Sequence, residues 1–186
     1  ELFFFFSKHL VDNGYDVKVI DLRDTYSSYR WNPLDAIWDL YQKYAHAQDE
    51  VYKRLDDVEK TNLEITGKVE DYKNAECWYE FNGKAYLEYD NLINAIKVFK
   101  KKTFDEVYED LNDLVSVLIP IENEKDPMWE KGARAITLAT LLAMLEDSEN
   151  PELNMVKEKY NFFNLAKILQ NSNNDYLELR KYFAGR

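Results

Sequence analysis

Glycine and proline are scarce in this chain, and their scarcity limits the folds that it can adopt. Only 5 glycines and 4 prolines occur in 186 residues, whereas β-propellers, collagen-like chains and disordered chains contain many more. Apolar residues make up 46% of the sequence and aromatic residues 15%, which is enough to build a substantial core. We therefore predict a mainly α-helical protein with one domain, or one domain and an appendage.

Charge and cysteine content narrow the class of protein further. The formal net charge of −11 opposes non-specific binding of nucleic acid unless the few cations are segregated on one face. Cys77 is the only cysteine, so no internal disulfide can form, as is usual inside cells. The longest nearly uncharged stretch, 135–145, is about half the roughly 20 residues that cross a bilayer. We expect a cytoplasmic chain that makes no membrane contact.

The first 33 residues differ from the rest. Residues 1–13 favour a helix that ends at a left-handed Gly14, and residues 15–22 alternate in polarity like a β-strand. A helix, a glycine and a strand form the second half of a βαβ unit, yet no second strand of matching length follows. The strand is therefore either an isolated edge strand or part of the sheet of a larger α/β protein, of which this chain is one piece. We favour the second interpretation.

From residue 34 onward the patterns are helical. Apolar positions recur at steps of four and three from Ile37 to Tyr72, which predicts one long helix with a weak point at Gly67. Further helices are expected at the following ranges: 90–99, 103–119 (opened by a Thr103–Glu106 capping box), 127–147 (opened by Asp126 and Pro127), a short one after 151, one from about 161 or 164, and 175–183. We predict a helical bundle with Ala139, Leu142 and Ala143 in its core.

A small β-hairpin is predicted between residues 77 and 89. Asn82 and Gly83 stand between aromatic residues, and this pair favours the type I′ turn that joins two short antiparallel strands. The four tryptophans of the chain suit either a core or a protein-binding face, and the sequence does not separate the two.

No arrangement of residues in the sequence indicates catalysis. The glycines are isolated, so no phosphate-binding loop is present, and neither His9 nor His46 has an evident partner. Cys77 is expected to be a small buried residue rather than a nucleophile. We predict no catalytic, cofactor-binding or metal-binding residue. The basic residues Lys97, Lys100, Lys101 and Lys102 are candidates for contact with an anion, although a role at a helix end is favoured for the run 100–102.

Three sets of motifs, taken together, resemble one family. They are GYDVKVIDL (14–22) leading into YRWNPL (29–34), DPMWEKGAR (126–134), and EDLNDL (109–114) ahead of LLAMLEDS (141–148). This chain is similar to the TraG-like type IV coupling proteins, which are membrane-anchored ATPases that deliver DNA and its relaxase to a conjugation channel. Trp31 stands where the family usually has tyrosine, and residues 74–89 match least well.

The resemblance implies an organisation and a role. Residues 1–33 would be a remnant of the RecA-like nucleotide-binding domain, and residues 34–186 would be the all-α domain inserted into that motor. ATP and Mg²⁺ would be bound only by the full-length, hexameric parent, at motifs outside this chain. The implied partners are a relaxase or a relaxosome accessory protein. Two alternatives stay open: direct contact with the transferred DNA, and a purely structural spacer in the hexamer.

Overall fold

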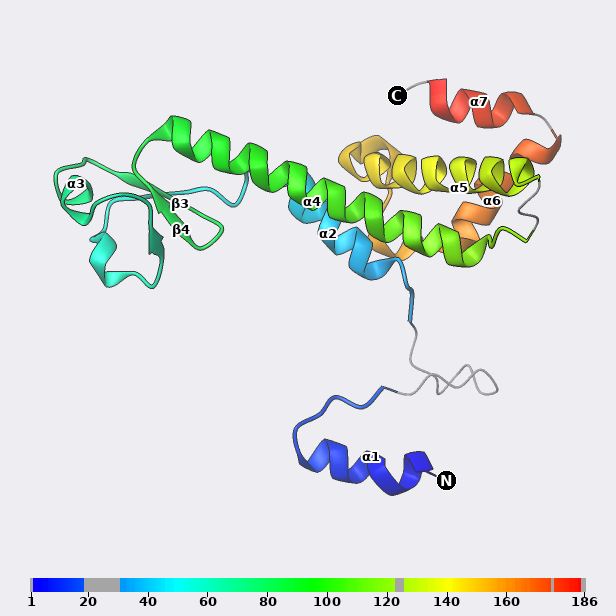
Figure 1. The fold of residues 1–186 in the computed structure, drawn as a ribbon, viewed down its shortest axis with the longest axis horizontal. Helices are drawn as coiled ribbons and strands as arrows, with labels where there is room; N and C mark the ends of the chain where they lie inside the picture. Colours follow the sequence, from blue (N-terminus) through cyan, green and yellow to red (C-terminus); the bar gives the residue numbers. More distant parts are fainter. Residues whose placement is uncertain (1, 19–30, 123–125, 175, 185–186) are drawn as a thin grey trace. The chain divides into compact units, whose positions relative to one another are not determined.

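A computed structural model describes positions 2–18, 31–122, 126–174 and 176–184 of the chain. These positions form two compact units, 1–33 and 34–186, and each is described by itself. The described residues are mostly helical, with seven α-helices and one small four-stranded sheet (Figure 1). The mainly α class is therefore confirmed, and the sheet was predicted only in part.

In the first unit, helix α1 (Leu2–Asp12) agrees with the prediction. Gly14 follows it with φ +83°, so the left-handed glycine that ends the helix is confirmed as well. The predicted strand at 15–22 is not: residues 15–18 have no regular structure, and the remainder of that range lies outside the described residues.

The second unit holds the remaining elements. Its α-helices are α2 (Asp35–Ala45), α3 (Val69–Lys73), α4 (Tyr89–Leu118), α5 (Met128–Glu146), α6 (Phe162–Asn174) and α7 (Tyr176–Ala184). Its strands are β1 (Tyr52–Arg54), β2 (Glu64–Ile65), β3 (Trp78–Phe81) and β4 (Lys84–Tyr86). Single 3₁₀ turns lie at Val58–Lys60, Asp147–Glu149, Pro151–Leu153 and Lys157–Lys159.

The long helix predicted from Ile37 to Tyr72 is wrong. Helix α2 ends at Ala45, and the Asp57 side chain accepts a hydrogen bond from the Glu59 amide, which starts a separate 3₁₀ turn. Gly67 has φ +99°, a backbone conformation that no helix interior allows. Local capping by polar residues therefore overrides the apolar spacing.

The sheet has the strand order β1-β3-β4-β2, in which β2 is parallel to β4 and the other pairs are antiparallel. Strands β3 and β4 form the predicted hairpin. Asn82 and Gly83 both have positive φ, 47° and 74°, as a type I′ turn requires, so this prediction is confirmed.

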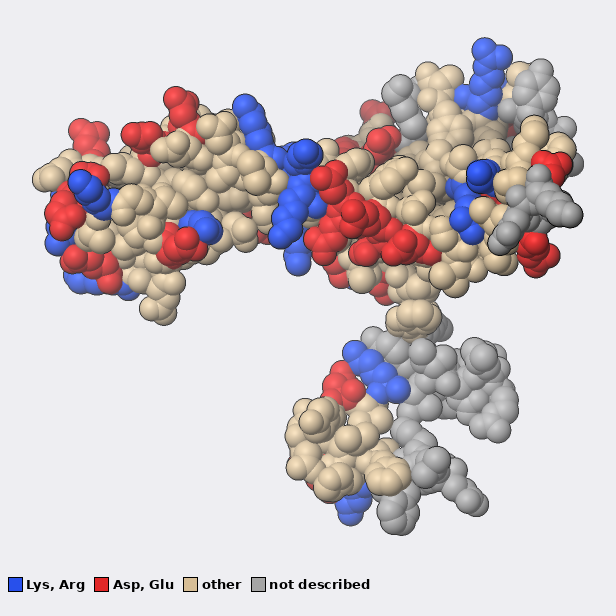
Figure 2. Space-filling model, in the orientation of Figure 1, with Lys and Arg blue, Asp and Glu red and all other residues tan. Residues whose placement is uncertain are grey.

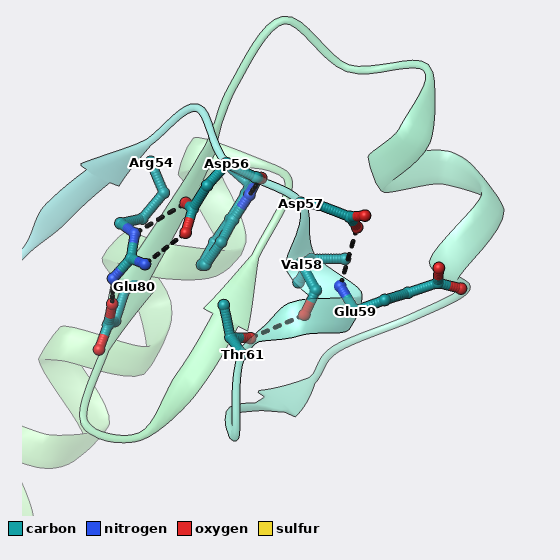
Figure 3. A network of polar contacts seen from close by, with 8 residues as sticks. Arg54, Asp56, Asp57, Val58, Glu59, Thr61 and Glu80 are labelled. Carbon is teal, nitrogen blue, oxygen red and sulfur yellow. Dashed lines mark hydrogen bonds and ion pairs between the residues drawn. The ribbon is translucent and has the colours of Figure 1, made fainter.

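The Arg54 guanidinium joins strand β1 to its neighbours (Figure 3). It donates hydrogen bonds to both carboxylate oxygens of Asp56, at 2.9 and 2.5 Å, and one of 2.6 Å to Glu80 on β3. It also lies 5.4 Å from the centre of the Trp78 ring, whose indole N–H donates to the Asp56 carbonyl at 2.8 Å. These contacts fix the edge strand on the sheet.

Helix α4 is one continuous helix, so the prediction of two separate helices at 90–99 and 103–119 is wrong. Thr103 lies buried inside it and caps nothing, because no glycine or proline interrupts residues 89–118. The first half of α4 packs Leu92 and Ile96 against the hairpin. Its second half packs Val107 and Leu111 into the main core with α2 and α5.

Helix α5 confirms the predicted helix at 127–147 to within a residue at each end, although Asp126 does not cap it. Arg134 on this helix donates to the Ile119 carbonyl at 2.7 Å and to that of Ser116 at 3.1 Å, so it caps the end of α4. The fully buried residues of α5 are Thr140, Leu141, Met144 and Leu145. Of the predicted core residues, Ala143 is buried and Leu142 is partly buried, but Ala139 is exposed.

The C-terminal helices agree with the sequence prediction. The Asn161 side chain accepts a hydrogen bond from the Asn164 amide at 3.0 Å and so opens α6. Helix α7 follows, and its Tyr182 hydroxyl donates to the buried Asp147 carboxylate at 2.9 Å.

Candidate partner-binding groove

A groove of about 790 Å³ lies where the β3–β4 hairpin, helix α4 and helix α2 meet. The hairpin contributes Phe81, Asn82, Lys84 and Tyr86; α4 contributes Asn94, Ala95, Val98, Phe99, Lys102, Thr103 and Glu106; and α2 contributes Leu40 and Lys43. The tight Asn82–Gly83 turn brings the hairpin over α4, so the groove depends on the fold of both.

The interior of the groove is apolar. Val98 is the most accessible apolar residue in it, with 69% of its surface exposed, whereas the aromatic residue Phe81 is only 2% exposed. The rings of Phe81 and Phe99 pack edge to face with centroids 5.4 Å apart, which holds this wall rigid. The groove therefore offers an aliphatic contact surface rather than an open aromatic face.

Lysines stand on all three sides of the groove. Lys43 comes from α2, Lys102 from α4 and Lys84 from the hairpin. The Lys84 ammonium lies 2.9 Å from a Glu64 carboxylate oxygen, and the hydrogen bond to that carboxylate raises the pKa of Lys84. Neither Lys43 nor Lys102 has a carboxylate oxygen within 4.0 Å among the described residues. In a chain with a net charge of −11, two unpaired cations beside one groove form a local attraction for anions.

The four lysines predicted to contact an anion do not act as one site. All lie in the middle of α4, so the favoured role at the end of their own helix is wrong. Lys102 lines the groove, and Lys97 and Lys101 are exposed outside it. The Lys100 ammonium lies 3.5 Å from the Ala45 carbonyl oxygen, at the end of α2, and is half-buried. Lys100 therefore holds two helices together.

An acidic band follows the lysines along α4. A shallow depression next to the groove is lined by Val98, Lys101, Lys102, Asp105, Glu106 and Glu109. Figure 2 shows the basic side chains gathered over the middle of the second unit, with a dense band of acidic ones beside them. A ligand of the groove thus meets positive charge at one position on α4 and negative charge one or two turns later.

The other candidates from the sequence have separate surroundings. His46 lies 3.1 Å from Asp49 and 3.7 Å from Glu149 through its two ring nitrogens, at the surface. Cys77 is half-buried and lines a smaller pocket of about 380 Å³ beside Trp78. No group of three potential metal ligands occurs within the described ranges, and none of the helices described there could span a bilayer.

The tryptophans divide between core and surface. Trp38 and Trp78 are buried, whereas Trp129, within the motif 126–134, is 78% exposed in the second unit. The motif 126–134 thus exposes Trp129 to solvent, while its Arg134 caps the end of α4.

Sequence reasoning missed the groove itself. It identified Lys102 and the hairpin turn separately, but Lys43 and Lys84 are far from Lys102 in sequence, and their meeting depends on α4 being continuous. No protein-family model, curated protein or solved structure matches this chain.

Proposed function

We propose that residues 34–186 form a non-catalytic receptor domain that binds a protein partner in the groove between α2, α4 and the hairpin. The observation that carries this proposal is an apolar groove containing Val98 and bordered by the unpaired Lys43 and Lys102. Buried apolar contact supplies binding energy in such interfaces, and charges around it supply orientation.

The motifs at 14–34 and 126–134 support a more specific version of the proposal. In this version the chain is the all-α domain of a TraG-like conjugative coupling protein, with a remnant of the motor at 1–33, and its partner is a relaxase or a relaxosome accessory protein. The helical core of α2, α4 and α5 fits a bundle of this kind. The four-stranded sheet beside it departs from an all-α domain.

The alternative of direct DNA contact receives less support from the charges. Asp105, Glu106 and Glu109 adjoin the lysines on the same helix and would repel a continuous phosphate backbone. A pure spacer receives less support because the groove of about 790 Å³, with unpaired lysines on two of its walls, is concave and suited to a ligand.

A pull-down of the immobilised chain with the cognate relaxase and, separately, with its accessory protein tests the proposal. We expect one of the two to be retained. Val98→Glu should abolish retention, whereas Val117→Glu should not, because Val117 lies on the same helix, is 79% exposed and is outside the groove. Retention of neither protein, or equal retention by both variants, would contradict the proposal.

A further inference from the structure

The groove between α2, α4 and the hairpin has a chemistry that indicates its ligand. We propose that it binds a short acidic peptide segment, with an aliphatic side chain placed on Val98 and acidic side chains directed to Lys43 and Lys102. This inference rests on the proposed function and adds to it the chemical class of the partner's binding segment.

The length of the groove suits a peptide. The α4 residues that line it run from Asn94 to Glu106, which at 1.5 Å per residue is about 18 Å. An extended chain covers that distance with about five or six residues at 3.3 Å each. Asn82 and Asn94 place side-chain amides on the lining, and amides can both donate to and accept from a peptide backbone.

The arrangement of charge requires acidic residues in that segment. Lys43 and Lys102 lie on different helices, and Lys84 adds a third cation from the hairpin. Because Lys84 is already paired with Glu64, Lys43 and Lys102 are the two lysines of the groove that can form ion pairs with a ligand. Their local positive charge favours an anionic segment at the groove, although the chain as a whole is acidic.

Glu106 sets the direction of the peptide. It lines the groove one turn beyond Lys102, at the last α4 position that contributes to the lining. A carboxylate there disfavours an acidic residue at that end and favours a hydroxyl, an amide or a basic residue. The segment is therefore acidic over Lys43 and Lys102 and neutral or basic over Glu106.

A nucleic acid fits the groove less well. Single strands are usually bound by stacking bases on exposed aromatic rings, but Phe81 and Tyr86 are buried, and the half-buried Phe99 ring is packed edge to face against Phe81. The most exposed apolar residue of the lining is Val98, which is aliphatic. The carboxylates of Asp105 and Glu109 next to the groove would also oppose a phosphate backbone.

Fluorescence anisotropy with the whole chain tests this inference. The probe is a fluorescein-labelled peptide in which leucines are flanked by glutamates on one side and by serines on the other. We expect saturable binding, weakened by about tenfold or more in the double variant Lys43→Glu with Lys102→Glu. Val98→Ser should weaken it as well. The matched controls are Lys131→Glu, an exposed lysine on α5, and Val117→Ser, and both should bind as the unaltered chain does.

Three outcomes would overturn the inference: no binding of the acidic peptide, equal binding of a peptide with lysines in place of the glutamates, or no effect of the Lys43 and Lys102 reversal. Tighter binding of a single-stranded oligonucleotide that the same reversal abolishes would assign the groove to nucleic acid instead. Retention of the relaxase or accessory protein in the pull-down, together with any of these outcomes, would leave the proposed function standing and reject only the acidic segment.

Discussion

The Lys100 ammonium lies 5.0 Å from the centre of the Tyr44 ring, so a cation on α4 covers an aromatic face at the end of α2. The Tyr44 ring in turn lies 5.1 Å from the ring of Phe104, one turn farther along α4. A lysine predicted from the sequence to lie at a helix end or to contact an anion is thus a packing residue between two helices.

Replacing this lysine should reduce stability in a way that its neighbour does not. We expect Lys100→Gln to lower the free energy of unfolding by about 0.5–1 kcal/mol, because the cation–π contact with Tyr44 is lost. Lys101→Gln removes the same charge from an exposed position and should change it by less than about 0.5 kcal/mol. Urea unfolding of both variants measures this, and equal effects would mean that the Tyr44 contact contributes nothing.

The continuity of α4 can be tested with proline. Lys101→Pro should cost about 3 kcal/mol or more, since it removes a backbone hydrogen bond in the middle of the helix. Tyr89→Pro, at the first helical position, should cost only about 1 kcal/mol, mainly through the lost ring contact with Tyr79. Circular dichroism and urea unfolding report both effects. A small effect of Lys101→Pro would contradict a continuous α4 and would favour the two separate helices that the Thr103–Glu106 capping pattern predicted.

The sequence predicted those elements whose signals are local. Gly14, the Asn82–Gly83 turn and the start of α6 near Asn161 each depend on a few adjacent residues, and each is confirmed. The long helix across Gly67 was wrong because apolar spacing alone cannot show which of two cores a residue joins. Ile37 belongs to the main core, whereas Val58 belongs to the core under the sheet.

The groove was beyond prediction for a related reason. Each of its three walls is visible in the sequence as a helix or a hairpin, but Lys43 and Lys102 meet only through tertiary packing. The strands β1 and β2 were also missed, because two or three residues carry too little alternation to distinguish a strand from a loop.

The main core should be sensitive to substitution in α5. Leu141 has no exposed surface, so Leu141→Ala should leave a cavity and cost about 2–5 kcal/mol. Leu142 is only partly buried, so Leu142→Ala should lower the free energy of unfolding by less. Leu153 is exposed, so Leu153→Ala should lower it least. Thermal and urea unfolding of the three variants should rank them in this order. A larger effect at Leu142 than at Leu141 would mean that α5 is rotated about its axis.

The Arg54 cluster should make the sheet sensitive to acid. The hydrogen bonds from the Arg54 guanidinium lower the pKa of Asp56 below its usual value. A carboxyl with a lowered pKa in the folded state stabilises the protein above about pH 4, and this contribution is lost as the pH falls. Arg54→Gln should therefore destabilise the chain at neutral pH and do so less as acid is added.

The Trp78 indole N–H, which donates to the Asp56 carbonyl, provides a reporter for this cluster in NMR spectra. Its signal should shift in Arg54→Gln. Lys60→Gln is the control, because the Lys60 ion pair with Asp57 is long, at 3.9 Å, and exposed. If the two variants lose stability equally at every pH, Asp56 is not held by Arg54 in solution.

Two buried tyrosines should make stability fall at alkaline pH. Burial raises the pKa of Tyr160, and burial together with Glu149 and Glu146 raises that of Tyr41. Above about pH 10 the unfolded chain ionises these hydroxyls while the folded chain keeps them protonated, so the unfolding free energy decreases with pH. The expected slope is about 1.4 kcal/mol per pH unit for Tyr160 alone.

Tyr160→Phe should remove that part of the slope in urea unfolding curves measured from neutral to alkaline pH. Tyr108→Phe, which removes a hydroxyl from an exposed ring on α4, is the control. An unchanged slope in Tyr160→Phe, or early phenolate absorbance from the folded protein that this variant lacks, would show that water reaches the Tyr160 hydroxyl.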